Sequence, residues 1–337
     1  TGTQMDFGFD ASFLNNRLTG TFDWYRRNTK DMLVAGATLP ATLGASVPKS
    51  NSADMKTIGW ELSLGWNDRL ENGFSYWVKG VLSDYQATIT KYAGNDAGFY
   101  SQSDGDGKYY VGQKIGEIWG YHSNGLFQSD DEAATIDQSE LYAGKWGAGD
   151  VKYEDLDNDG KITKGEETIY NPGDKSIIGN KTPRYQFGIT VGFDYKNFDF
   201  EMFWQGTGKR DYMLSGAQFW GFTSQWDVPY TPALDYWTET NTDAYFPRPG
   251  WQNGGNRVTS DRYLQSAAYG RLKNLTVGYT IPKNLTTKWG ISRLRLYVTG
   301  ENLLTITPLN DAFDPETLGG MTYPINRKVA IGLNLTL

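Results

Sequence analysis

The most specific chemical pattern in the chain is a run of acidic residues with regular spacing. Asp155, Asp157 and Asp159 stand at alternate positions, a glycine follows, and Glu166 closes a stretch of twelve residues. Calcium-binding loops place carboxylates at positions 1, 3 and 5, a glycine at 6, a backbone carbonyl at 7 and a chelating glutamate at 12. The spacing therefore predicts a calcium site made by Asp155, Asp157, Asp159, the carbonyl of Lys161 and Glu166. A solvated acidic turn without metal is the alternative.

A second group of residues suited to ligand contact lies in the segment Lys209 to Ser266, which is rich in tryptophan and tyrosine. Aromatic rings stack on the apolar faces of sugars or on peptide side chains, and neighbouring carboxylates and amides hold polar groups. We expect Trp220, Trp226 and Trp251 to contact substrate. The alternative is that these rings pack the segment upon itself or against a partner protein.

Catalytic chemistry has little support in the sequence. The single histidine, His122, is predicted to make ordinary polar contacts, because the chain lacks the GxSxG turn that presents a nucleophilic serine. Many carboxylates stand in expected loops, but nothing sets two of them at the separation of a glycosidase pair. With no cysteine, disulfides and thiolate metal sites are excluded. The protein is therefore not expected to be an enzyme.

The chain of 337 residues is acidic, with a net charge of -7, and contains 12 Trp, 22 Tyr, 16 Phe and 40 Gly. Nucleic-acid binding is not expected, because such proteins usually carry clustered Lys and Arg. No apolar stretch approaches the roughly 18 residues that a membrane-spanning helix needs. Abundant aromatic residues and glycines are instead typical of an all-β chain with many turns.

Apolar and polar residues alternate over long stretches, which places one kind on each face of a strand. From Arg184 to Tyr195 every odd position is aromatic or aliphatic and every even position is polar or glycine. The alternation predicts nine strands, and most have the roughly 9 to 11 residues of a tilted membrane strand. The other eight are Gln4–Phe13, Arg17–Asn28, Thr57–Asn67, Phe74–Lys91, Phe198–Gly208, Ala267–Ile281, Ser292–Thr305 and Lys328–Leu337.

Short and long connections alternate between these strands, as they do in outer-membrane barrels with tight periplasmic turns and long external loops. We therefore predict an all-β fold, a transmembrane antiparallel β-barrel, with residues 92–183 and 209–266 as long extracellular loops. The other long connections are Thr29–Lys56 and Ile306–Arg327. Nine antiparallel strands begin and end in the same direction, so we expect this chain to be part of a larger barrel.

A soluble β-sandwich with its apolar face turned inward is the alternative fold. It would make the protein a secreted carbohydrate-binding or glycan-cleaving protein. Such a fold gives no reason for short and long connections to alternate.

Seven segments carry a resemblance to a known family, the C-terminal region of SusC/RagA-type TonB-dependent transporters. Together they extend over nearly the whole chain. They are DWYRRNTKDML (23–33), GQKIGEIWGYHSNGLFQS (112–129), GDVKYEDLDNDGKIT (149–163), IIGNKTPRYQFGITVGFDYKNFDFEMFWQG (177–206), YLQSAAYGRLKNLTVGYTIPKNL (263–285), LRLYVTGENLLT (294–305) and YPINRKVAIGLNLTL (323–337).

The resemblance implies a 22-stranded barrel in the outer membrane of a Gram-negative bacterium, of which residues 1–337 would form the last nine strands. The plug domain and the segment that contacts TonB would lie outside this sequence. A SusD-like surface lipoprotein is the implied partner, and TonB-dependent import of glycans or peptides is the implied function.

Overall fold

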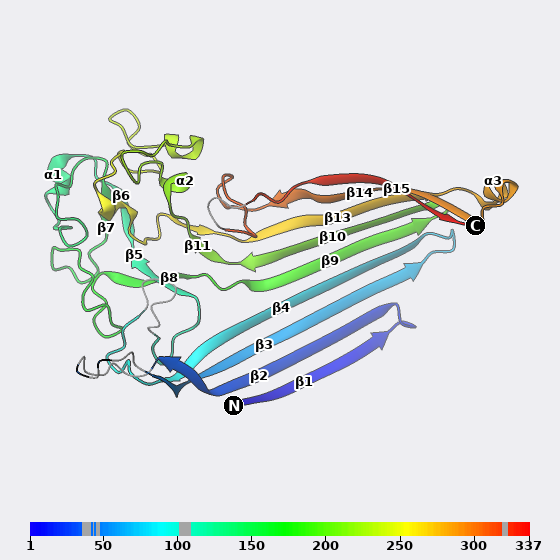
Figure 1. The fold of residues 1–337 in the computed structure, drawn as a ribbon, viewed down its shortest axis with the longest axis horizontal. Helices are drawn as coiled ribbons and strands as arrows, with labels where there is room; N and C mark the ends of the chain where they lie inside the picture. The colour runs from blue at the N-terminus through cyan, green and yellow to red at the C-terminus, as the bar shows by residue number, and fades with distance from the viewer. Residues whose placement is uncertain (36–41, 43, 45–47, 101–108, 319–322) are drawn as a thin grey trace.

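The structure is a computed structural model that describes all residues except 36–41, 43, 45–47, 101–108 and 319–322. Its main feature is one antiparallel sheet whose strands are arranged in the order in which they occur in the chain, from β1 at one edge to β15 at the other (Figure 1). The nine strands are β1 (Gly2–Phe13), β2 (Leu18–Ala35), β3 (Lys49–Arg69), β4 (Ser75–Tyr92), β9 (Arg184–Tyr195), β10 (Phe198–Lys209), β13 (Tyr269–Thr280), β14 (Arg293–Ile306) and β15 (Lys328–Thr336).

The nine predicted strands are confirmed, and β9 has the predicted bounds. The prediction of a long loop from Thr29 to Lys56 is wrong, because most of this segment extends β2 and β3. The two strands stay paired up to Ala35 and Lys49, past irregularities between Thr29 and Leu33. These irregularities break the alternation, so the pattern alone ends β2 too early and begins β3 too late.

The register of the sheet lines up residues of one kind across all nine strands. One row of partners is apolar at every position except a single glycine: Phe13, Leu18, Trp66, Val78, Val191, Met202, Leu275, Gly300 and Val329. The row beside it, displaced by one residue on each strand, is polar except for glycine and one phenylalanine: Ser12, Thr19, Gly65, Lys79, Thr190, Phe203, Asn274, Glu301 and Lys328. Since neighbouring residues point to opposite faces, the sheet has one apolar and one polar face.

The apolar face is not covered by a second sheet in the part of the chain that is described. Large side chains on it, such as Phe7, Val277 and Ile331, remain exposed, and the other sheets are two-stranded ribbons between the long strands. Burying such a face stabilises a fold by about 25 cal/mol per Å², so it requires an apolar surrounding. The alternative β-sandwich is therefore wrong.

Aromatic side chains gather on this face near the short turns. Phe193 stacks on Phe74 and on Phe200, with ring centroids 5.4 and 5.1 Å apart, and Phe198 lies 4.7 Å from Tyr279. Rings at this level are typical of the belt where a membrane strand meets the lipid headgroups.

Three long connections build a separate body at the opposite end of the sheet, which we call the cap (Figure 1). It consists of the described parts of residues 93–183, 210–268 and 307–327, referred to below as the first, second and third connections. The first contains β5 (Glu117–Tyr121), β6 (Ser123–Leu126), α1 (Asp130–Ala133), β7 (Val151–Tyr153) and β8 (Lys175–Asn180). The second contains β11 (Asp211–Met213), α2 (Ala217–Trp220), η2 (Thr231–Leu234), η3 (Gly254–Arg257) and β12 (Leu264–Ser266).

Two short helices, α3 (Lys283–Thr286) and η4 (Thr287–Trp289), lie at the end with the short turns. None of the described helices is long and apolar enough to cross a membrane.

The main hydrophobic cluster of the described chain lies in the cap and contains no residue of the nine long strands. All three connections contribute to it: Tyr121, Leu126, Val151, Tyr153 and Ile162 from the first, Leu214, Phe219, Trp220, Trp237, Ala244, Phe246, Tyr263 and Ala267 from the second, and Leu309, Phe313 and Leu318 from the third. The cap is therefore a folded body with its own core, and this core holds the three connections together.

Candidate functional site

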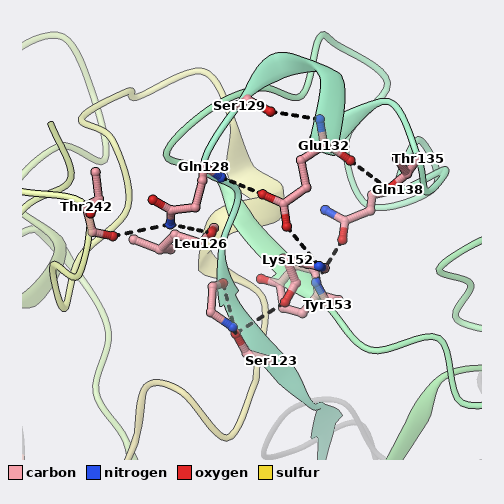
Figure 2. Close-up of polar contacts among 11 residues, drawn as sticks. Ser123, Leu126, Gln128, Ser129, Glu132, Thr135, Gln138, Lys152, Tyr153 and Thr242 are labelled. Atoms are coloured by element: carbon pink, nitrogen blue, oxygen red, sulfur yellow. Dashed lines mark hydrogen bonds and ion pairs between the residues drawn. The ribbon is translucent and has the colours of Figure 1, made fainter. Parts of the chain in front are cut away.

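Polar contacts join the connections of the cap to one another. Gln128 donates from Nε2 to the carbonyls of Leu126, at 2.8 Å, and Thr242, at 3.3 Å, so it links the first connection to the second (Figure 2). The buried amide of Gln138 donates to the carbonyl of Val151 and accepts from the backbone N–H of Tyr153. A buried amide with both of its polar atoms satisfied adds rigidity at little cost.

The helix α1 shows why the sequence folds this way locally. Ser129 caps its first turn by accepting from the backbone N–H of Glu132, and the Glu132 carboxylate accepts from the backbone N–H of Gln128. The other oxygen of Glu132 pairs with Lys152 at 2.9 Å (Figure 2). This serine and glutamate, three residues apart, form a variant of the capping box.

The three tryptophans predicted to contact substrate occupy different environments. Trp220 is only 8% exposed and packs edge-to-face against Tyr263, with centroids 4.5 Å apart. Trp226 is 83% exposed and Trp251 is 47% exposed. The structure thus brings Trp220 into the cap core and leaves the other two rings open to solvent.

The acidic turn has the local geometry that its spacing predicts for the first three positions. The carboxylates of Asp155, Asp157 and Asp159 offer oxygens that lie within 4.8 Å of one another. Asp155 accepts from the backbone N–H groups of Asn158, at 2.7 Å, and Gly160, at 2.8 Å. Gly160 has φ +83°, and since a Cβ there would meet no atom, the backbone angle and not space demands glycine.

The negative charges of the carboxylates in this turn repel one another. Desolvation and the neighbouring Asp159 carboxylate raise the pKa of Asp157. For Asp155, desolvation works in the same direction, but hydrogen bonds from Gly160, Asn158 and Asp159 outweigh it and lower the pKa. A cation held among the three carboxylates would relieve this repulsion.

Glu166, predicted as the twelfth ligand, is not a member of this carboxylate group. Gly165, directly before Glu166, adopts φ +56°, and its backbone packs against Gly173; no helix follows the turn. In calcium loops of this kind, a following helix carries the last ligand back to the ion.

Asp174 is a residue of this region that the sequence did not point to. Its carboxylate is fully buried and accepts from the backbone N–H of Leu156 and of Thr163, both at 2.7 Å. It therefore closes the acidic turn at both ends. It lies outside the twelve-residue motif, so no spacing rule marks it.

His122 makes polar contacts, as predicted, but their partners were not foreseen. Its Nδ1 lies 2.8 Å from Asp261 Oδ2 and its Nε2 lies 2.7 Å from Ser176 Oγ. This is the order of groups in a Ser-His-Asp triad. Ser176, however, lies inside strand β8 with ordinary backbone angles, not on the strained elbow that exposes a nucleophile.

Comparisons with known proteins relate the chain to one family over its whole length. No family model matches it. The TonB-dependent receptor P3 of Formosa agariphila is 29% identical over 99% of this chain, and the TonB-dependent receptor SusC of Bacteroides thetaiotaomicron is 26% identical over 99%. The chain is therefore similar over its whole length to TonB-dependent receptors of the SusC type. The chain is accordingly part of an outer-membrane protein of a Gram-negative bacterium, as the resemblance implies.

The fold of the chain matches that of solved transporter structures. The RagAB peptide transporter superposes with a TM-score of 0.76 over 99% of the chain at 22% identity, and the RagAB peptide importer in the open-open state superposes with 0.75. The predicted antiparallel β-barrel wall is therefore confirmed. The chain spans 34% of the length of receptor P3 and 31% of that of SusC, about a third of each.

Proposed function

We propose that this chain supplies part of the wall and of the external cap of a TonB-dependent importer that carries glycans or peptides across the outer membrane. The observation that carries the proposal is the joint presence of an apolar face continuous over nine strands and a cap with its own core at one end of them. The first suits a lipid surrounding, and the second provides rigid external loops.

A SusD-like lipoprotein is the proposed partner, seated over the cap. Among the comparison proteins, one is named SusC and the solved structures are RagAB peptide transporters. In the proposed mechanism, substrate is captured between the cap and the lipoprotein. A plug then moves under force from TonB, which it contacts through a part of the protein outside this chain.

Trp220, Trp226 and Trp251 are the proposed substrate contacts. Trp226 and Trp251 offer open ring faces in the second connection. Trp220 is held in the core by Tyr263 and lines a small hollow of the same connection. The proposed role of the cap is binding and not catalysis, which agrees with relatives that are receptors and transporters.

The experiment removes the gene from its bacterium and restores the full-length protein from a plasmid, with growth measured on a panel of oligosaccharides and peptides. We expect deletion to abolish growth on one substrate class, and deletion of TonB to do the same. Changing Trp226 and Trp251 to Ala together should lower uptake. Trp289→Ala is the matched control, because Trp289 is 65% exposed at the opposite end of the strands. Undiminished growth on every substrate without the gene would refute import.

We also propose that the acidic turn binds calcium. Asp155, Asp157 and Asp159 would supply carboxylate oxygens and Lys161 its backbone carbonyl, as a hard cation prefers. The converging carboxylates fit such an ion, whereas Glu166 would have to move to take part. The ion would supply positive charge that holds this part of the first connection in shape.

A further inference from the structure

The apolar face of the sheet ends, on the side of the cap, at a pair of tryptophans. Trp24 on β2 and Trp60 on β3 lie directly opposite each other. Between Trp66, near the short turns, and Ile58 every second residue of β3 is apolar, over the roughly 9 residues that a membrane-spanning strand needs. Tryptophan is enriched where such a strand leaves the hydrocarbon and meets the lipid headgroups. The tryptophan pair therefore marks the boundary of the membrane on the cap side.

Basic side chains follow on the same face, closer to the cap (Figure 1). Arg26 and Lys56 share the face of the tryptophan pair, because each is an even number of residues away from the tryptophan of its own strand. Lys56 lies opposite Thr88 of β4, which forms a bridge with Lys114 of the first connection on its other side. The two lysines therefore stand in one row. We call Arg26, Lys56 and Lys114 the cationic belt.

We propose that the cationic belt binds the phosphate groups of lipopolysaccharide in the outer leaflet of the membrane. The inference rests on the proposed function, which places the cap on the outside. The lipid A headgroup carries its phosphates where the acyl chains end, and the belt follows directly after the apolar span. Arginine and lysine bind phosphate through charge-assisted hydrogen bonds, and their long side chains reach from the boundary into the headgroups.

The side chains of the belt have no anionic partner in the part of the chain that the structure describes. Arg26 and Lys114 are exposed and Lys56 is partly buried, and none of the three forms an ion pair. Arg26 Nε donates to a neutral group, the amide oxygen of Asn28, at 3.3 Å. Glu117 accepts from the backbone N–H of Lys114, not from its ammonium group.

Other carboxylates near the belt have cations of their own beside them. The pairs are Asp84 with Arg184, which binds both of its oxygens, Asp54 with Lys91, directly opposite on the neighbouring strand, and Asp31 with Lys30, adjacent in the chain. Even with Glu117 counted against the belt, three cations and one carboxylate leave an excess of positive charge. An anionic headgroup complements this charge.

The test measures lipid binding to the purified full-length protein in detergent by native mass spectrometry. The probes are diphosphoryl lipid A, its dephosphorylated form and phosphatidylglycerol. We expect diphosphoryl lipid A to bind about tenfold more tightly than the dephosphorylated form, and more tightly than phosphatidylglycerol. Arg26→Gln together with Lys56→Gln should remove the preference for the phosphorylated form.

Arg27→Gln together with Lys79→Gln is the matched control, because it removes two cations from the opposite, polar face of β2 and β4. Arg27 donates to Gln4 on that face, and Lys79 stands in the polar row. The control variant should bind lipid A like the parent protein. Both double variants should melt at the temperature of the parent protein when no lipid is added, since they replace side chains at the surface.

Three results would overturn the proposal. They are equal binding of phosphorylated and dephosphorylated lipid A, an equal loss of preference in the two double variants, and binding of phosphatidylglycerol as tight as that of lipid A. Lipid binding is measured without TonB, the lipoprotein or a nutrient. Such a result therefore leaves the growth experiment, and the import proposal, untouched.

Discussion

His122 Nδ1 and Asp261 Oδ2 lie 2.8 Å apart although 139 residues separate them in the chain. The second oxygen of Asp261 accepts from the backbone N–H of Ser123, so the carboxylate is held by two groups of the first connection. Because Asp261 belongs to the second connection, this contact ties the two largest parts of the cap together.

Replacing His122 should loosen this tie. His122→Ala removes the hydrogen bonds to Asp261 and Ser176, and we expect the cap to lose about 1–2 kcal/mol of stability. Hydrogen exchange of β5 and β8 in the intact protein measures this loss. Ser176→Ala breaks only one of the two bonds and should cost about half as much. Equal protection in all three proteins would contradict a tie at this position.

Ser176 should not act as a nucleophile, in spite of its hydrogen bond to His122. A fluorophosphonate probe that labels activated serines is expected to leave the purified protein unmodified, with a serine hydrolase as the positive control. Labelling that disappears in Ser176→Ala and in His122→Gln would instead show an acyl-transfer site and contradict the proposal that the chain only binds.

The two faces of the sheet should respond differently to the same charge. Val191 and Thr190 are neighbours on β9, in the apolar and the polar row respectively. Val191→Lys is expected to cost about 2–4 kcal/mol, because a lysine on a lipid-facing strand position is poorly solvated. Thr190→Lys, the matched control, should change stability little. Urea unfolding in lipid vesicles compares the two variants. Equal losses of unfolding free energy would contradict the assignment of the two faces.

The ends of the strands should lie on opposite sides of the membrane. The chain contains no cysteine, so single cysteines report their own position. Trp226→Cys, in the exposed part of the cap, should react with a membrane-impermeant maleimide on intact cells. Glu71→Cys, in the exposed turn between β3 and β4, should react only after the outer membrane is opened. If Glu71→Cys reacted on intact cells and Trp226→Cys only after the outer membrane was opened, the cap would lie on the periplasmic side.

Calcium should stabilise the first connection. Asp157→Asn together with Asp159→Asn removes two of the three converging carboxylates, so we expect bound calcium to be lost and chelator to have no further effect on melting. Glu166→Gln, outside the cluster, should retain the ion. Metal analysis of the purified proteins decides this, and equal calcium in parent and double variant would refute the site.

The sequence by itself determined the strands, the faces and the first part of the acidic turn. These depend on consecutive residues: alternation places Val191 and Thr190 on opposite faces because strand geometry repeats every two residues. The carboxylates of Asp155 and Asp159 converge because backbone bonds within the turn hold them. Such arrangements require no partner from elsewhere in the chain.

Only the tertiary structure decided what the long connections do. Trp220 and Trp226 have the same side chain and lie six residues apart in sequence, yet one is in the core and the other in solvent. The difference comes from Tyr263 and Phe246, which reach Trp220 from the far part of the connection. Likewise Asp261 reaches His122, and Glu166 lies outside the acidic cluster although the spacing predicts it as a ligand. Contacts of this kind depend on how long loops close upon one another, and local periodicity carries no information about that closure.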